Sequence, residues 1–258
     1  MEDYLDIKPI NFSNEKHFID EIENIMSITK DTQLEWNKRE EALKRIGGII
    51  LGNYGQSMNF LKILNNKLYL NISIQMMNLR STLLKEACRI VILAAKTYRN
   101  QFDQGVEKLI SSIVLYKLIA SANKVISECG SKCVSEIIKY VESERIIIKI
   151  IEQINSKNIT VRLKSTQFLL YILNNYKKQF LLKQQINIEQ FIINTTHDPS
   201  LEVRSIARQL FIQYNELYTE RSSELFEKFD TGVKKAITDE NKKYECYRTN
   251  SCIITKPN

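Results

Sequence analysis

The stretch that decides the expected fold is Asp198-Pro-Ser-Leu-Glu-Val-Arg-Ser-Ile-Ala-Arg208. It begins with a turn-prone Asp-Pro-Ser, and its basic residue, Arg204, is followed three positions later by a small one, Ala207. The same order of polar turn, basic residue and, in most copies, small residue recurs upstream at intervals of about 40 residues.

The repeated positions can be aligned on the basic residue. The aligned basic residues are Arg39, Arg80, Lys124, Arg162 and Arg204. The residues three positions later are Ala42, Leu83, Ser127, Ser165 and Ala207, and all but Leu83 are small. A small residue at this position would let the two helices of one repeat approach closely. A period near 40 with two helices in each unit is typical of HEAT and armadillo repeats.

Helical spacing fills the segments between the turns. Apolar residues recur at three- and four-residue steps, for example at Ala42, Leu43, Ile46, Ile49 and Ile50. We expect the helix pairs 16–30 with 34–52, 56–77 with 79–98, 102–120 with 123–141, 144–155 with 159–176, and 185–196 with 200–215, then a shorter pair within 217–238. The sequence therefore predicts an all-α protein, an α-solenoid of about six HEAT repeats in which each unit buries one face against its neighbours.

Domain limits follow from the same pattern. Residues 16–238 contain no linker and are expected to form one domain. Residues 1–15 read as an N-terminal lead-in, and residues 239–258 as a polar, flexible tail. With only 3 prolines and 7 glycines, the chain is poorly supplied with the turns of a β-rich fold.

Charge and composition limit the functional classes. A net charge of +7 would attract an acidic protein surface, nucleic acid or an anionic membrane, and charge alone does not choose among them. Residues 1–30 lack the continuous apolar core of a signal peptide, and no run of 18 apolar residues occurs. We therefore expect a cytoplasmic setting and no membrane span.

The cysteine and histidine pattern is not that of a metal site. Cys129 and Cys133 are one helical turn apart and could in principle supply two zinc ligands, but the paired cysteine or histidine partners of a zinc site are missing. The odd number of cysteines, 5, favours reduced thiols. We expect no metal and no cofactor, and we read His197 as a loop residue without chemistry.

Several segments resemble the TOG domains of the CLASP and crescerin families. Glu35-Trp-Asn-Lys-Arg-Glu-Glu-Ala-Leu-Lys-Arg-Ile46 resembles the opening of the first repeat, where a tryptophan, an arginine and Ala-Leu introduce the second helix. The later matches, in order, are Asn78-Leu-Arg-Ser with Lys-Glu-Ala-Cys88, Lys124-Val-Ile with Cys-Gly-Ser131, Lys157-Asn with Val-Arg162, and Asp198 to Arg208. The family's usual aspartate is Asn78 here, and the sixth repeat is less well defined.

The resemblance implies a flat paddle whose intra-repeat loops line one narrow edge and bind αβ-tubulin. In the family the first loops meet β-tubulin and the fifth meets α-tubulin. Carried over by motif, the tubulin-binding candidates are Trp36, Arg80, Lys124, Lys157, Asn158, Arg204 and Arg208. The resemblance also implies regulation of microtubule dynamics at the spindle, cortex or cilium, by a monomeric domain within a longer protein with several TOG domains.

Each candidate also has a purely structural interpretation. Trp36 could plug the N-terminal end of the solenoid instead of anchoring a partner. Recurrent arginines can bind loop carbonyls of their own repeat, and this role fits Arg39 and Arg162 better than contact does. Arg80 fits either role equally, whereas Arg204 follows a proline-containing loop that should project, which favours contact. Lysines such as Lys124 and Lys157 are often only solvated.

Two other functions compete with tubulin binding. A generic HEAT adaptor would hold a peptide on its helical face, and a HEAT-like DNA glycosylase would bind an extruded base in an aromatic cleft. The sequence lacks the phosphate-binding loop GxxxxGK, the nucleophile motif GxSxG and the metalloprotease motif HExxH. We therefore expect a binding protein and not an enzyme.

Overall fold

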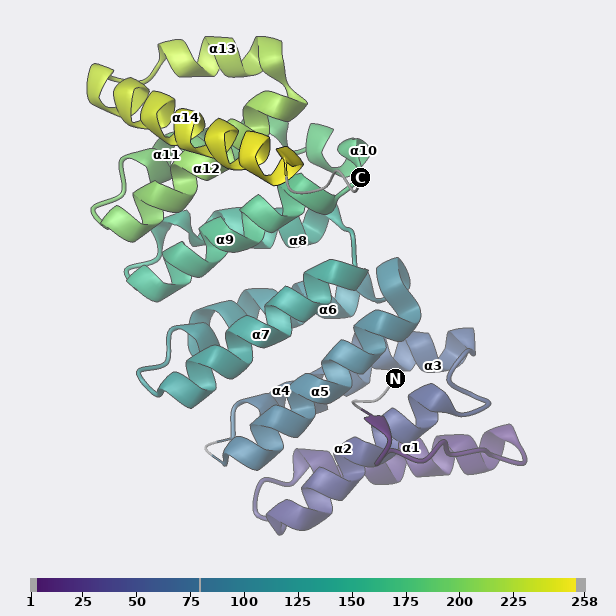
Figure 1. Ribbon diagram of the computed structural model, residues 1–258. Coiled ribbons are helices and arrows are strands. Elements are labelled where there is room, and N and C mark those ends of the chain that lie inside the picture. Colours follow the sequence, from purple (N-terminus) through teal and green to yellow (C-terminus); the bar gives the residue numbers. More distant parts are fainter. Residues whose placement is uncertain (1–3, 79, 254–258) are drawn as a thin grey trace. The chain divides into compact units, whose positions relative to one another are not determined.

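The computed structural model describes the backbone of residues 4–78 and 80–253, with side chains throughout except at 112, 113, 115, 116 and 244–253. All regular elements in this part of the chain are helices (Figure 1). The chain divides into two compact units, Met1–Lys149 and Ile150–Asn258. The single domain over 16–238 stays a prediction.

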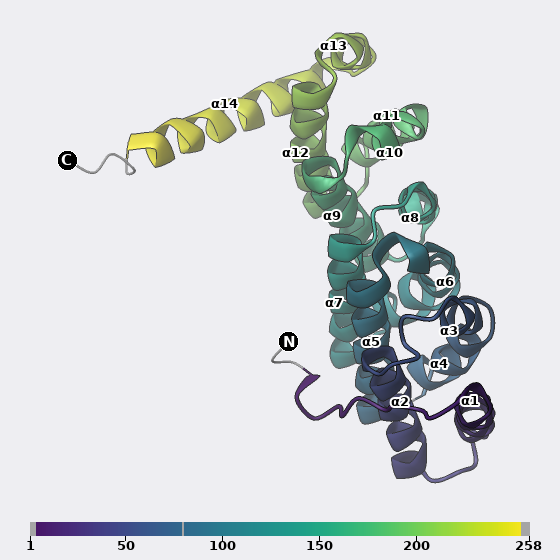
Figure 2. The same cartoon turned by 90° about the vertical axis from the view of Figure 1, so that its right-hand side faces the viewer.

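The first unit consists of consecutive helix pairs. They are α1 (Glu15–Lys30) with α2 (Trp36–Leu51), then α3 (Met58–Ile63), the π-helical turn η2 (Leu64–Leu68) and α4 (Tyr69–Met76) with α5 (Ser81–Tyr98), then η3 (Arg99–Phe102), α6 (Asp103–Leu109) and the π-helical η4 (Ile110–Ile119) with α7 (Lys124–Tyr140), and finally α8 (Glu144–Ile151). The second helices α2, α5 and α7 lie side by side in one layer, and the first helices form another (Figures 1 and 2). The predicted pairs are thus present.

The second unit repeats this arrangement and then departs from it. Its elements are η5 (Glu152–Asn155), α9 (Ile159–Asn175), α10 (Lys178–Leu182), α11 (Gln185–Thr196), α12 (Leu201–Leu217), α13 (Thr219–Glu227) and α14 (Thr231–Ile253). Helix α12 packs against α9, α11, α13 and α14. Helix α14 continues past residue 238, after which the sequence pattern predicts a polar, flexible tail. The segment after 238 is polar and weakly periodic, yet it has no glycine or proline before Pro257 to end a helix.

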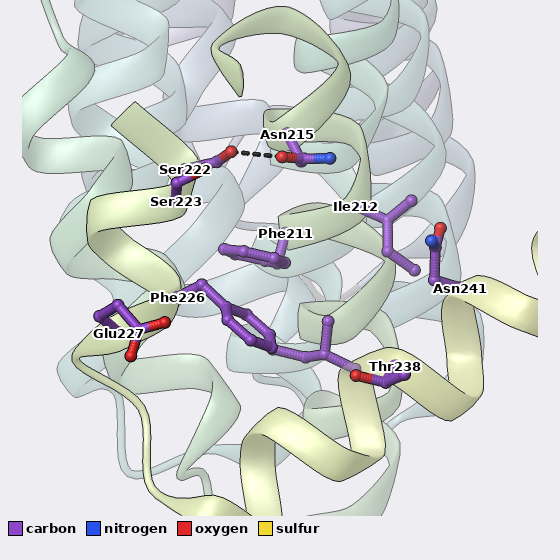
Figure 3. A pocket seen from close by; sticks show the side chains of 10 residues that line it. Phe211, Ile212, Asn215, Ser222, Ser223, Phe226, Glu227, Thr238 and Asn241 are labelled. Carbon is purple, nitrogen blue, oxygen red and sulfur yellow. Dashed lines mark hydrogen bonds between the residues drawn. The ribbon is translucent and has the colours of Figure 1, made fainter. Parts of the chain in front are cut away.

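A pocket of about 340 Å³ lies where α12, α13 and α14 meet (Figure 3). Phe211, Ile212, Phe226 and Ile237 supply its apolar lining, and the rings of Phe211 and Phe226 lie 5.8 Å apart. Asn215 and Ser222, which are hydrogen-bonded to each other, form part of its polar rim (Figure 3). Residues of α13 and α14 line this pocket together with α12, and none of the predicted binding residues is among its lining residues.

The second helix of each repeat (α2, α5, α7, α9 and α12) carries a small buried residue in its seventh position. These residues are Ala42, Ala87, Gly130, Ser165 and Ala207. A Cβ atom added to Gly130 would lie 2.6 Å from the Cβ of Leu118 in η4, so α7 approaches its partner helix too closely for any side chain. The two helices of each repeat therefore pack most closely at the small residue of the second helix.

This register corrects the alignment made from the sequence. Arg39, Arg162 and Arg204 occupy the fourth helical position, but Arg80 is the N-cap of α5 and Lys124 is the first residue of α7. Leu83 is therefore not equivalent to Ala42. The equivalent residue of α5 is Ala87, so the small residue is present in all five repeats. An alignment based on charge mixed three structural positions, because lysine and arginine are common at several places near a helix start.

The N-terminal lead-in packs on the second-helix layer of the first unit (Figure 2). The backbone N–H of Ile10 donates to the carbonyl of Gly48 at 2.9 Å. A Cβ atom at Gly48 would lie 2.7 Å from the carbonyl oxygen of Lys8, so the segment can approach α2 this closely only at glycine. Asp6 accepts two hydrogen bonds from Arg89 of α5, at 2.6 and 2.9 Å.

The cysteines of the first unit lie between α5 and α7. Cys88 and Cys133 are buried and Cys129 is half-buried, and all three are free thiols. A hydrogen bond with Cys88, together with burial, raises the pKa of Cys129. Within the described part of the chain, no group of histidine, cysteine or acidic residues could hold a metal ion. The side chains of Cys246 and Cys252 fall outside the described residues.

No helix in the described ranges is both long enough and apolar enough to cross a membrane.

The close helix approach predicts a specific sensitivity to size. Ala87→Leu should lower the free energy of unfolding by about 1–3 kcal/mol, because extra methylenes force α5 away from its partner helix. Thr82→Leu places a leucine at an exposed position of α5 and should change the free energy of unfolding by less than about 0.5 kcal/mol. Urea denaturation of the two variants measures the difference, and equal effects would show that the seventh position is not a packing constraint.

Candidate functional site

The loops inside the repeats of the first unit lie at the same ends of its helices (Figure 1). They precede α2, α5 and α7, because each repeat is a helical hairpin and each hairpin turns on the same side. The first helical residue after each loop is exposed: Trp36, Ser81 and Lys124. The loop ends of these helices therefore present side chains that the packing between helices does not use.

Trp36 and Arg80 meet across two neighbouring loops. Trp36 begins α2 and is 38% exposed, and the guanidinium carbon of Arg80 lies 4.5 Å from the centroid of its ring. This distance is that of a cation–π contact. The backbone N–H of Arg80 donates to Oδ1 of Asn78 at 2.9 Å. Asn78 thus provides the acceptor that the family's aspartate would provide, and it fixes the turn that carries Arg80.

Lys124 projects into solvent at the start of α7. Its N-cap, Asn123, accepts hydrogen bonds from the backbone N–H groups of Val125 and Ile126. The ammonium group of Lys124 lies 3.8 Å from Glu128, and the two side chains are 87% and 67% exposed. An ion pair this exposed contributes little, so Lys124 remains available to a partner.

The two loops of the second unit are joined by a buried ion pair. Arg162 donates two hydrogen bonds to the carboxylate of Asp198, at 2.7 and 3.1 Å, and a third to the carbonyl of Ser156 at 2.8 Å. Burial opposes the ionisation of Asp198, but the hydrogen bonds from Arg162 and from the N–H of Ser200 outweigh it and lower its pKa. Asp198 therefore stays charged and connects the loop before α9 with the loop before α12.

Arg204 is used within its own loop. Its Nη1 donates to the carbonyl oxygens of Asp198 and Pro199, at 2.6 and 3.0 Å, and the residue is half-buried. Arg39 does the same in the first repeat, where its Nε donates to the carbonyl of Leu34 at 3.0 Å. The structural interpretation of Arg39 and Arg162 is confirmed. Arg204 shares their helical position and also binds carbonyl groups of its own loop. The proline-containing loop before it had instead favoured contact with a partner.

The other candidates of the second unit differ in exposure. Lys157 is exposed in the loop before α9. Asn158 is the N-cap of α9, and its side chain accepts from the N–H groups of Thr160 and Val161. Arg208 is half-buried and lies 3.6 Å from Glu240 of α14. Of these three residues, only Lys157 presents its polar group freely to solvent.

Exposed apolar residues at the loops were missed by the sequence analysis. Val125, Ile159 and Leu201 stand in the first turn of α7, α9 and α12, and their exposed fractions are 48%, 47% and 67%. Met77, in the loop before α5, is 40% exposed. In the sequence they look like the first members of the buried helical stripe. The available signal was their position directly after the turn, where a side chain precedes the packed part of the helix.

His197 has partners that its interpretation as an inert loop residue did not include. Its Nδ1 lies 2.9 Å from the carbonyl oxygen of Ile193, and its Nε2 lies 3.0 Å from Oδ2 of Asp230. Both ring nitrogens thus face acceptors, which only the protonated imidazolium can satisfy at once. The hydrogen bond to Ile193, opposed by partial burial and supported by Asp230, raises the pKa of His197. The side chain fastens the end of α11 to the residue that precedes α14.

The raised pKa of His197 predicts a pH-dependent stability. The stabilisation from its charge should be complete below the ordinary histidine pKa of about 6.5 and should be lost as the pH rises through the higher value of the folded protein. Asp230→Asn keeps an acceptor for the N–H of Val233 but removes the charge. The difference in unfolding free energy between the wild type and this variant should therefore shrink as the pH rises above about 6.5. A constant difference would contradict the charged pair.

The chain is similar to known proteins over most of its length. A family model described as CLASP N terminal matches residues 18–238. The CLIP-associated protein of Arabidopsis thaliana is 26% identical over 237 residues, which cover 91% of this chain and 16% of that protein. The chain therefore spans about a sixth of the length of the curated relatives it matches first.

Solved structures share the fold at lower identity. A structure from work on tubulin recruitment and assembly by microtubule polymerases with TOG domain arrays has a TM-score of 0.66 at 18% identity, covering 93% of this chain and 48% of that chain. A TOG domain of Mini spindles from Drosophila melanogaster has a TM-score of 0.65 at 16% identity, covering 85% and 92%. The predicted HEAT-repeat solenoid of the TOG class is confirmed. Since the family model covers most of its length, the chain belongs to the CLASP N-terminal family.

Proposed function

We propose that this chain is a non-catalytic module that binds αβ-tubulin through its intra-repeat loops and contributes to the regulation of microtubule dynamics. The contact of Trp36 with Arg80 carries the proposal. A partly exposed tryptophan beside an arginine is the composition typical of binding hot spots. The similarity in fold to a TOG array that recruits tubulin supports the choice of partner.

In the first unit, the proposed contacts are Trp36, Arg80 and Lys124. Trp36 offers apolar area, and Arg80 and Lys124 offer cations to an acidic surface. Lysine at the rim of an interface mainly speeds encounter, whereas a half-buried aromatic residue mainly slows dissociation. The three side chains stand on short loops between packed helices, so little of their backbone freedom is lost on binding.

In the second unit, we assign direct contact to Lys157 and to the exposed residues Ile159 and Leu201. Asn158, Arg204 and Arg208 act from within the protein. Asn158 caps α9, Arg204 holds the carbonyls of the loop before α12, and Arg208 pairs with Glu240. Their loss would alter the loops that carry the contact residues, so their effect on binding would be indirect.

The mechanism is selective binding. A rigid set of loops that fits one conformation of tubulin better than another shifts tubulin towards that conformation, by no more than the difference in affinity. A single module holds one partner at a time, and simultaneous binding of several tubulin dimers requires linked copies of such modules. We propose that the module acts at microtubules within a longer protein.

Peptide binding on the helical face is the less favoured alternative. The N-terminal segment of the chain already lies on the second-helix layer of the first unit, where Asp6 binds Arg89 and Ile10 binds Gly48. An adaptor would need this surface for its ligand. The intra-repeat loops, by contrast, are not covered by any described segment.

Truncation of the tryptophan tests the apolar contact. Trp36→Ala should weaken binding to unpolymerised αβ-tubulin by about 2 kcal/mol or more, roughly a thirtyfold rise in Kd, because the anchor loses its contact area. The matched control is Met58→Ala. Met58 is 63% exposed and begins α3 at the opposite ends of the helices. Analytical ultracentrifugation gives both constants, and an unchanged affinity for Trp36→Ala would exclude the loops as the binding surface.

Charge reversal tests the electrostatic contact. Lys124→Glu should slow association with tubulin about threefold or more at low salt, and the difference should narrow as salt screens the charge. Lys62→Glu makes the same change in net charge at an exposed position of α3, away from these loops. Stopped-flow measurements at several salt concentrations separate a local effect from one of net charge, since equal slowing by both variants would contradict contact at Lys124.

A further inference from the structure

We propose that Arg80 is a positioning residue for Trp36, and that the stacked pair forms one preassembled platform for a carboxylate flanked by an apolar surface. The tubulin-binding role of this platform rests on the proposed function. The stack itself does not, since it is a contact within the chain. The proposal joins two loops that sequence reasoning treats as separate contacts.

Among the described residues, no hydrogen bond fixes the ring of Trp36. It is the first residue of α2, and the preceding N-cap residue, Glu35, makes no side-chain capping hydrogen bond. The residue is 38% exposed, so neighbouring atoms cover only part of the ring. An indole at a helix start can rotate about its side-chain bonds unless a neighbour restricts it. The guanidinium of Arg80 lies over the ring, 4.5 Å from its centroid, and is placed to restrict this rotation.

Arg80 can lie on the ring of Trp36 because, among the described residues, it does not bind the carbonyl groups of its own loop, as the other repeated arginines do. Arg39, Arg162 and Arg204 donate to the carbonyls of their own loops. Arg80 stands at the N-cap instead of the fourth helical position, and within the described ranges its side chain forms no ion pair. Its backbone is held by Asn78. A fixed backbone with an unengaged side chain lets the guanidinium lie on the neighbouring ring.

The geometry of a stacked guanidinium defines the ligand it can take. The N–H donors of arginine lie in the plane of the group, so a face resting on an indole leaves those donors at the edge. A carboxylate can approach that edge and accept two hydrogen bonds. The exposed part of Trp36 lies beside it and offers apolar area. The platform therefore suits an aspartate or glutamate with an apolar neighbour, and a lysine at position 80 would not reproduce it.

The first test observes the stack without tubulin. Trp36 is the only tryptophan, so fluorescence excited at a wavelength that the 12 tyrosines do not absorb reports on this ring alone. Arg80→Ala should raise the acrylamide quenching constant about twofold and shorten the local component of the anisotropy decay, because the ring loses a neighbour on one face. Arg80→Lys should behave similarly, since it keeps the charge and loses the planar group. Lys85→Ala, an exposed residue of the same helix, should match the wild type.

The second test measures coupling in binding. Tubulin affinity is determined for Trp36→Ala, Arg80→Ala and the double variant. Positioning predicts that Arg80→Ala weakens binding about tenfold in the wild type and less than about threefold when Trp36 is already absent. Circular dichroism and thermal unfolding confirm that the variants remain folded.

The outcomes separate the two proposals. Unchanged quenching and anisotropy in Arg80→Ala would overturn the stack, whatever happens to tubulin binding. Altered fluorescence with fully additive losses of affinity would also overturn the positioning role. Altered fluorescence with no loss of affinity in any variant would support the stack and refute the tubulin function instead.

Discussion

The close approach of the two helices in each repeat is the constraint on which the rest of the structure depends. It is made possible by a small residue in the seventh position of the second helix, from Ala42 to Ala207, with Gly130 the tightest case. Where the helices touch at this point, their loop ends are brought together over a short turn. A short turn between packed helices has few conformations, so the backbone that carries the binding side chains is held in place before any partner arrives.

Hydrogen bonds at the fourth helical position complete this restraint. Arg39, Arg162 and Arg204 each donate to a carbonyl of the preceding loop, and in the third repeat the hydroxyl of Ser127 donates to the carbonyl of Ile119 at 2.8 Å. The chemistry differs, but the task is the same, because buried carbonyl groups in a tight turn need donors. The second repeat has Leu84 at this position, and its N-cap arginine is the one that lies on Trp36.

The sequence predicted the helix pairs well, because a buried stripe must recur at helical spacing whatever the partner. It predicted the binding side chains less well. Charge alone aligned Arg80 and Lys124 with three arginines that stand deeper in their helices, and it could not distinguish an arginine that binds its own loop from one that faces solvent. The bond between Arg204 and Asp198 and the pair of Arg208 with Glu240 depend on backbone positions that no local pattern encodes. The length of α14 was not predicted either, because its polar residues show no helical periodicity.

The first helical position shows why repeats conceal their binding residues. Trp36, Ser81, Lys124, Ile159 and Leu201 all occupy it, and all are exposed. No packing restricts their chemistry, so they differ from repeat to repeat, whereas the seventh position stays small. Averaging over repeats therefore finds the residues that hold the structure and misses those free to bind. Trp36 was identified from sequence through its match to the tryptophan that opens the second helix of the family's first repeat. Leu201, which is more exposed than Trp36, was not identified. In a repeat protein of this kind, variation at a structurally constant and exposed position is the better indicator of a binding surface than recurrence.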